Sequence, residues 1–244
     1  MAIVFLFWGK PSENLRFTAS LLHFSLSLHC KKKVMKQKAY IVGICGGSAS
    51  GKTYLLHALL KNFQESECAL ISQDNYYKPK HLQDTNEDGL INFDHPNSLN
   101  MDKLMEDVQQ LLEGKTIHVT EYTFNKENVV PQVFTYSPTP IIILEGILIY
   151  HKKALADMMD LKVFVDADEH VRLTRRLVRD VQERDYSYED TLRDYNKFVA
   201  PMYAQFVEPT KKICDIIIPN NHHMDVATEV IINHIRTKLS TFAE

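Results

Sequence analysis

Residues 46–53 are the first stretch whose types and spacing indicate chemistry: GGSASGKT fits the pattern G-x-x-x-x-G-K-[ST]. The backbone N–H groups of such a loop surround phosphate oxygens, and the loop residues are Gly46, Gly47, Ser48, Ala49, Ser50 and Gly51. The ammonium of Lys52 then reaches the β- and γ-phosphates, and the hydroxyl of Thr53 ligates Mg²⁺. The motif therefore predicts binding of a nucleoside triphosphate together with magnesium.

A second candidate is Asp74, which follows a short apolar segment at residues 69–72. A carboxylate at the carboxyl end of a strand in a parallel α/β sheet points into the crevice where ligands bind. There it can accept a hydroxyl proton and orient that oxygen toward a γ-phosphate. Alternatively, Asp74 caps the next helix, and its spacing alone leaves both interpretations open.

Glu145 ends a run of four apolar residues within residues 140–146 (PIIILEG). A carboxylate at the end of a buried strand beside a phosphate loop can hold Mg²⁺ or its water shell, as in a Walker B segment. The alternative is a solvated strand end with no metal role. The position favours a magnesium partner.

Five arginines form the densest basic cluster after residue 38: Arg172, Arg175, Arg176, Arg179 and Arg184. Each of the first four lies three or four positions from two of the others, so they share one face of a helix. Their acidic neighbours Asp180, Glu183 and Asp185 lie mostly at the far end of the segment. The cluster favours a movable lid that brings guanidinium groups to a transferring phosphoryl group, over a solvated charged face.

The elements that must position these residues alternate along the chain. Apolar, β-branched segments predict strands at 39–45, 69–72, 140–146, 161–165 and 214–218. Helical spacing predicts helices at 54–62, 101–113, 152–159, 169–183, 189–206 and 225–240. This alternation predicts an α/β protein of the P-loop NTPase class, with a parallel sheet and helices on both faces. A small substrate-side subdomain containing β structure is expected around residues 76–136.

Composition limits the function classes. Of 244 residues, 45% are apolar and 24% are charged, which is ordinary for a globular chain. Residues 1–38 carry seven Lys/Arg and one acid, which leaves 21 basic and 30 acidic groups in the rest. An acidic body argues against a nucleic-acid partner. The four cysteines form no C-x-x-C pair, and residues 140–150 are too short to span a bilayer, so we expect a cytoplasmic protein with no membrane partner.

Residues 1–34 differ from the remainder. They contain an apolar start, a Ser- and Leu-rich middle and three consecutive lysines. One interpretation is a targeting segment, and the other is a translated upstream region, with Met35 as the true start. Either way, we expect a non-globular extension at 1–34 and a single P-loop kinase domain at 35–244.

Several segments stand in a fixed order over roughly residues 39–240: GGSASGKT (46–53), SQDNYY (72–77), NFDHP (92–96), ILEGILIY (143–150) and FVEPTKKICDIIIP (206–219). In the order and spacing of these segments the chain resembles the uridine kinase and phosphoribulokinase-like group, and is most similar to the uridine kinases. This resemblance implies transfer of the ATP γ-phosphoryl group to the 5′-hydroxyl of uridine or cytidine, as in pyrimidine salvage. It also implies a homo-oligomer, a tetramer.

The resemblance implies a role for several residues. Asp74 matches the catalytic carboxylate, with Lys52, Arg176 and Arg179 acting on the phosphates. Thr53, Glu145 and Asp74 match the magnesium partners. The nucleoside would contact the aromatic residues and the ribose-binding carboxylate at Tyr77, Asp94, Tyr122 and Phe124, together with Arg176.

Three departures from the family pattern fall on the acceptor side. Glu127 stands where the family has a histidine that reads the pyrimidine edge, and Asp194 stands where a glutamine is common. The family's Glu-Arg-Gly-Arg is here Glu-Arg-Asp-Tyr, which ends at Tyr186. Replacing an imidazole by a carboxylate removes a donor, so it can exclude uracil or favour a base with amino donors.

Other functions remain open on the sequence. One is a kinase of another nucleoside or small hydroxylated acceptor, and another is an ATP-binding homologue that has lost its acceptor. A GTPase switch is disfavoured because neither D-x-x-G nor N-K-x-D occurs.

Overall fold

Five apolar strands form one parallel sheet in the computed structural model, which describes residues 39–123, 129–184 and 186–242. The described residues all belong to the unit Met35–Glu244. From one edge to the other, the strands are β2 (Cys68–Ser72), β5 (Ile141–Glu145), β1 (Tyr40–Cys45), β6 (Leu161–Asp166) and β7 (Ile216–Pro219). Ile44 of β1 and Ser72 of β2 both stand opposite Glu145 of β5, so the strand ends align at the carboxyl edge.

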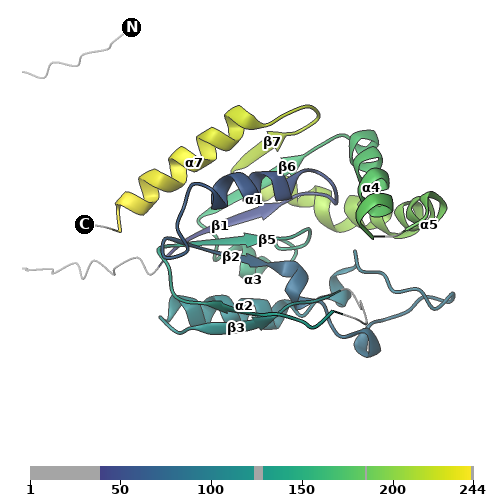
Figure 1. Cartoon of the computed structure of the whole chain (residues 1–244), viewed down its shortest axis with the longest axis horizontal. Helices are drawn as coiled ribbons and strands as arrows, with labels where there is room; N and C mark the ends of the chain where they lie inside the picture. The colour runs from purple at the N-terminus through teal and green to yellow at the C-terminus, as the bar shows by residue number, and fades with distance from the viewer. Residues whose placement is uncertain (1–38, 124–128, 185, 243–244) are drawn as a thin grey trace, which may run out of the picture. The chain divides into compact units, whose positions relative to one another are not determined.

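Helices cover both faces of this sheet (Figure 1). One face packs against α1 (Lys52–Leu60) and α7 (Asp225–Ser240), and the other against α2 (Met101–Leu112) and α3 (Lys153–Ala156). Strand β1 supplies both cores: Tyr40, Val42 and Ile44 belong to the first, and Ile41 and Cys45 to the second. A strand buried on both faces must be apolar throughout, which explains the continuous run in its sequence. The predicted α/β architecture is confirmed.

The region predicted as one helix at 189–206 is an interrupted helix. It begins as α5 (Tyr188–Asp194), widens into π-turns at Tyr195–Val199 and Tyr203–Val207 on either side of α6 (Ala200–Met202), and tightens at Glu208–Ile213. Pro201 has no N–H to donate, which disrupts the regular hydrogen-bond ladder. Because the tight turn continues to Ile213, strand β7 starts two residues later than predicted.

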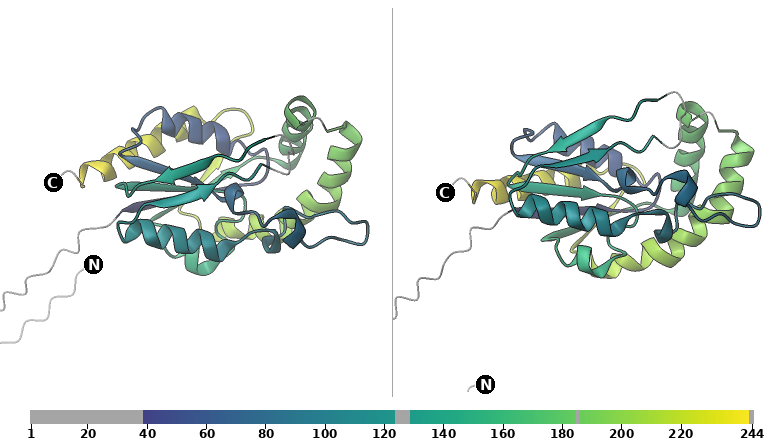
Figure 2. Two further views of the ribbon diagram at one scale, coloured as in Figure 1. Left: turned by 60° about the horizontal axis from the view of Figure 1, so that its bottom comes forward. Right: turned by 90° about the horizontal axis from the view of Figure 1, so that it is seen from below.

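The substrate-side region contains the expected β structure. Strands β3 (Ile117–Thr120) and β4 (Val133–Tyr136) form an antiparallel pair apart from the main sheet. Between β2 and α2 the chain runs mostly as loops and short turns, which Figure 2 shows at the same end of the molecule as α4 (Glu169–Arg184) and α5. An ion pair between Asp88 and Lys197 joins this loop to the interrupted helix.

Among the residues that the structure describes, no helix is both long and apolar enough to cross a membrane.

Candidate active site

The phosphate loop follows β1 and turns directly into α1. Gly51 stands just before α1 at a φ of 104°, and a Cβ there would lie 2.1 Å from Nδ2 of Asn220. That nitrogen donates to the Ser50 carbonyl at 2.7 Å. Gly46 has a φ of 154°, and a Cβ there would lie 2.3 Å from the Val165 carbonyl oxygen. Both glycines of the motif are therefore required by backbone conformation and by close packing.

Lys52 is buried at the start of α1, with its ammonium inside the loop. Its Nζ donates to the carbonyls of Gly46 and Gly47 at 3.0 and 3.2 Å and lies 4.0 Å from Oε1 of Glu145. Thr53, the next residue, is exposed and lines a cavity that opens at the carboxyl edge of the sheet. Loop, lysine and carboxylate thus meet at the carboxyl edge of the sheet, as the motif spacing predicts.

A cavity of about 480 Å³ opens at this edge. Its lining combines the loop and the strand ends with the substrate-side loops and with α4 and α5. Among the residues that line it are Ser48, Ala49, Gly51, Lys52, Thr53, Asp74, Tyr77, Phe93, Asp94, Glu145, Arg175, Arg176, Arg179, Arg184 and Asp194.

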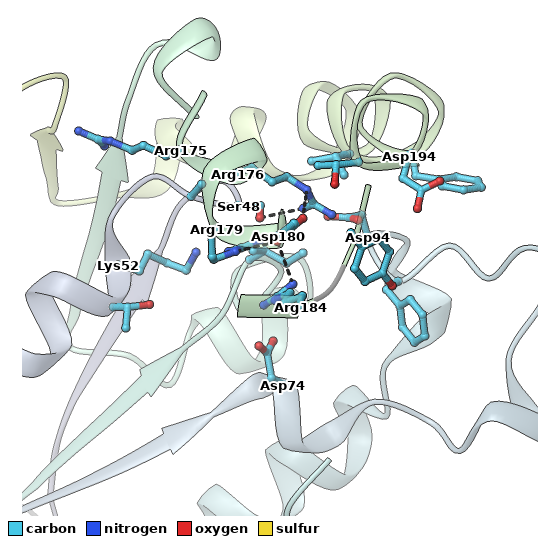
Figure 3. Close-up of a pocket in the computed structure, with 18 of the residues that line it drawn as sticks. Ser48, Lys52, Asp74, Asp94, Arg175, Arg176, Arg179, Asp180, Arg184 and Asp194 are labelled. Atoms are coloured by element: carbon cyan, nitrogen blue, oxygen red, sulfur yellow. Dashed lines mark hydrogen bonds and ion pairs between the residues drawn. The ribbon is translucent and has the colours of Figure 1, made fainter. Parts of the chain in front are cut away.

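Asp74 lies two residues beyond β2, in the short turn Gln73–Tyr76, and Ser72 is the residue that caps this turn. The Ser72 hydroxyl accepts from the backbone N–H of Asp74 at 3.3 Å and donates to Oε2 of Glu145 at 3.2 Å. The alternative that Asp74 caps the following turn is therefore wrong. Its carboxylate instead points into the cavity toward Arg184 (Figure 3). Ser72 therefore links the backbone of Asp74 to the side chain of Glu145. The sequence analysis did not predict this role.

Burial perturbs both carboxyls. Desolvation raises the pKa of Asp74 above its usual range, while the charges of Lys52, Arg184 and Arg179 oppose that rise. Desolvation likewise raises the pKa of Glu145 to about 7, with Lys52 opposing and Asp74 adding to it. A carboxylate that is desolvated but faces cations is suited to take a proton during a reaction.

Aromatic and acidic side chains form the other wall of the cavity. Tyr77, Phe93 and Asp94 line it, and the rings of Tyr77 and Phe93 meet edge to face at 5.5 Å. Tyr122 packs on Tyr77 at 5.3 Å but is not among the cavity-lining residues. Phe124 lies outside the described residues. Phe93 is the aromatic residue that sequence reasoning missed, although it stands next to Asp94 in the NFDHP segment.

The arginines of α4 divide into two groups. Arg172 is buried and does not line the cavity: its Nε donates to the Ala167 carbonyl at 3.0 Å and its guanidinium lies 3.7 Å from the ring centre of Tyr203. A Cβ on Gly47 of the phosphate loop would lie 2.7 Å from its Nη1, so this arginine packs against the loop. Arg175 lines the cavity and donates to the Asn220 carbonyl at 2.9 Å. These two arginines share the predicted face, but they also fasten α4 to its surroundings.

Arg176, Arg179 and Arg184 form the second group, which faces the cavity (Figure 3). Arg176 donates to the hydroxyl of Ser48 in the phosphate loop at 2.9 Å. All three arginines pair with the buried carboxylate of Asp180. The sequence analysis treated Asp180 only as one of the acids at the far end of the cluster. Its position four residues after Arg176 and four before Arg184 was the pattern that could have predicted these pairs.

Comparisons with known proteins identify the family. A model described as "Phosphoribulokinase / Uridine kinase family" matches residues 41–227, which is well over half of the chain. The chain belongs to this family. The resemblance stated from the sequence is thereby confirmed.

Curated relatives agree with this membership. The chain is 40% identical to a uridine kinase of Lactobacillus johnsonii over 209 residues, which cover 85% of this chain and 99% of that protein. It is also 40% identical to uridine-cytidine kinase A of Dictyostelium discoideum over 199 residues, or 82% of this chain, and it spans 40% of that longer protein. The structure of phosphoribulokinase from Rhodobacter spheroides shares the fold, with a TM-score of 0.53 at 12% identity, over 75% of this chain and 70% of that one.

Two departures from the family pattern lie in the cavity. Tyr186 and Asp194 both line it, and Tyr186 is half exposed. Arg193 pairs with the Asp194 carboxylate at 2.9 Å, so part of that negative charge is compensated. Glu127 and Asp185 lie outside the described residues.

The donor set suits the magnesium ion that this family uses with ATP. Thr53, Asp74 and Glu145 bring a hydroxyl and two carboxylates to one cavity, and all three supply the hard oxygen atoms that Mg²⁺ prefers. Mg²⁺ binds few protein ligands and takes the remainder from water and phosphate, so a sparse set of this kind fits it.

Proposed function

We propose that this protein transfers the γ-phosphoryl group of ATP to the 5′-hydroxyl of uridine or cytidine, giving ADP and the nucleoside 5′-monophosphate. The observation that carries the proposal is the single cavity that joins a phosphate loop to Asp74, with an aromatic and acidic wall beyond it. The activities named for the two curated relatives support this assignment.

Asp74 acts on the acceptor in this proposal. Its carboxylate accepts the proton of the 5′-hydroxyl as the oxygen attacks the γ-phosphorus, and the bond from that phosphorus to the β-phosphate oxygen breaks to release ADP. Burial raises the pKa of Asp74, and a carboxylate with a higher pKa is a better proton acceptor near neutral pH. Asp94 accepts hydrogen bonds from the two vicinal ribose hydroxyls, which a carboxylate can do at once.

Lys52, Arg176 and Arg179 stabilise charge on the phosphates. Lys52 stands in the loop, and Arg176 already bonds the loop through Ser48, so both are positioned for the β- and γ-phosphates. Thr53, Asp74 and Glu145 would hold magnesium, which neutralises phosphate charge when it is bound. Tyr77 is assigned to the wall around the base, with Tyr122 packed against it. The resemblance adds Phe124 to this wall.

The nature of the acceptor follows from charge. The cavity wall carries Asp74, Asp94 and Asp194 as well as the arginines of α4, which this proposal assigns to the phosphates of ATP. A phosphate on the acceptor would therefore compete with ATP for those cations and would meet three carboxylates. A neutral polyhydroxylated acceptor such as a nucleoside fits this wall better. Asp194 and Tyr186 favour a second candidate, a kinase of a nucleoside with a different base, because they change the charge and shape of this wall.

The resemblance also supports a homotetramer in the cytoplasm as part of the proposal. Light scattering after size-exclusion chromatography tests the tetramer; a monomer would contradict it.

The decisive experiment is ADP release by the full chain with Mg·ATP and a panel of uridine, cytidine, adenosine, guanosine and nicotinamide riboside. We expect turnover with uridine or cytidine and a 5′-monophosphate product by mass spectrometry. Turnover with a purine nucleoside alone would overturn the pyrimidine assignment and support the second candidate. ATP binding without turnover on any acceptor would identify a homologue that has lost its acceptor.

A further inference from the structure

Three of the four arginines of α4 that line the cavity share one partner. Oδ2 of Asp180 lies 3.1 Å from Nε of Arg176, and Oδ1 lies 2.7 Å from a terminal nitrogen of Arg179 and 3.6 Å from one of Arg184. The Asp180 side chain is 4% exposed, whereas the three arginine side chains are 15%, 27% and 42% exposed. A single, largely buried carboxylate in the cavity wall is therefore shared by three guanidinium groups that line the same cavity.

Such a group of cations needs a counter-charge. Three guanidinium groups around one carboxylate carry a net charge of two, and their repulsion is strong because the site is partly desolvated. The crowding is evident at Arg179, whose pKa is lowered by burial first and then by its arginine neighbours, while Asp180 opposes the shift. Without the carboxylate, the arginines would separate toward solvent.

We propose that Asp180 is a positioning residue that gathers Arg176, Arg179 and Arg184 over the phosphate end of the cavity before ATP binds. A carboxylate has two oxygens and a guanidinium has five N–H groups, so one carboxylate can pair with several guanidinium groups, and a guanidinium held in this way can still donate to a second acceptor. Arg176 demonstrates this division: it pairs with Asp180 and also donates to Ser48 of the loop. Preorganised cations stabilise a developing charge without the cost of being ordered during the reaction.

This inference rests on the proposed phosphoryl transfer, but binding tests it without an acceptor. Titration calorimetry of the full chain measures the affinities for Mg·ADP and for Mg²⁺ with a non-hydrolysable ATP analogue. In Asp180→Asn, which keeps the volume and removes the charge, we expect analogue binding to weaken about 10- to 100-fold, because charge-assisted hydrogen bonds to the γ-phosphate are lost. We expect binding of ADP, which lacks that phosphate, to change less than about threefold.

The matched control is Asp157→Asn, which breaks an exposed i,i+4 pair with Lys153 outside the cavity and should leave both affinities unchanged. Equal affinities in wild type and folded Asp180→Asn would overturn the inference, and so would an equal loss for both nucleotides. If Asp180→Asn does not fold, Asp180→Glu decides: its longer side chain should lower the preference for the analogue over ADP by at least about threefold, and an unchanged preference would overturn the proposal. A wild type that binds both nucleotides but phosphorylates no nucleoside would contradict the proposed function alone.

Discussion

The phosphate-loop side and the acceptor side of the cavity are built from different kinds of structure. The first is formed by the ends of buried strands and the start of a helix, where Lys52 and its neighbours are fixed by the core. The second is formed by loops after β2 and by the interrupted helix, whose aromatic and acidic side chains are half-buried. The residues that contact the phosphates are therefore held in place by the core of the fold. The residues that contact the acceptor can be substituted without disturbing that core, so the choice of acceptor can change while phosphate binding is kept.

The largest effect should come from Asp74, where the two sides meet. Asp74→Asn keeps the shape but removes the base, so we expect kcat to fall by roughly 10²–10⁴. Nucleotide affinity should stay near that of wild type, because the loop is untouched and Thr53 and Glu145 remain to hold magnesium. Steady-state kinetics with calorimetry measures both, with Asp157→Asn as the control. Full turnover in Asp74→Asn would remove Asp74 from the role of base.

Lys52→Ala should damage the phosphate-loop side in a different way. The ammonium lies inside the loop, so its loss removes charge from both bound ATP and the transition state. We expect kcat/KM for ATP to fall by about 10²–10³, with kcat and KM both affected. Lys61→Ala, at the exposed far end of α1, is the control. Unchanged kinetics for ATP would contradict the function assigned to the loop.

Asp94→Asn should affect the acceptor side alone. An amide accepts more weakly than a carboxylate and carries no charge, and a hydrogen bond to a charged group contributes about 1.5–3 kcal/mol. We expect KM for the nucleoside to rise about 10- to 100-fold, while KM for ATP changes little. Kinetics with each substrate varied in turn makes the measurement, and Asp84→Asn, an exposed carboxylate between β2 and α2, is the control. An equal rise in both KM values would mean that the two sides are not separable.

The same division explains what the sequence could and could not predict. Residues 46–53 are contiguous, and Glu145 ends a strand that pairs with β1, so local pattern and sheet register together placed the phosphate-loop side. The parallel sheet followed from apolar runs that must be buried on both faces. Both features can be predicted because each depends on residues that are close together in the sequence.

The remaining features depend on side-chain partners that a pattern does not single out. Ser72 bonds a residue 73 positions away, and an acid at i,i+4 spacing from arginines, such as Asp180, is usually an ordinary surface pair, so neither role was predicted. The π-turns around Pro201 were missed since helical periodicity does not register an extra residue in a turn. Residue propensity and spacing predict single helices and strands, whereas these features depend on contacts between them.

The smallest predicted effect concerns the stability of the phosphate-loop side. Burial raises the pKa of Glu145 to about 7 in the folded protein, whereas an unfolded glutamate titrates near its ordinary value of about 4.3. Between these values the folded state holds a proton that the unfolded state has released. The free energy of unfolding should therefore fall as pH rises through this range and level off above it.

Urea unfolding without nucleotide or magnesium measures this effect at about pH 5 and about pH 8. The control is Glu145→Gln, which cannot titrate, so its stability relative to wild type should be greater at the higher pH. The pH dependence of groups far from Glu145 is common to both proteins and cancels in the difference, so the difference reports Glu145 together with its neighbour Asp74. A difference that is constant with pH would mean that folding does not raise the pKa of Glu145, and the desolvation assigned to this carboxyl beside the phosphate loop would lose its support.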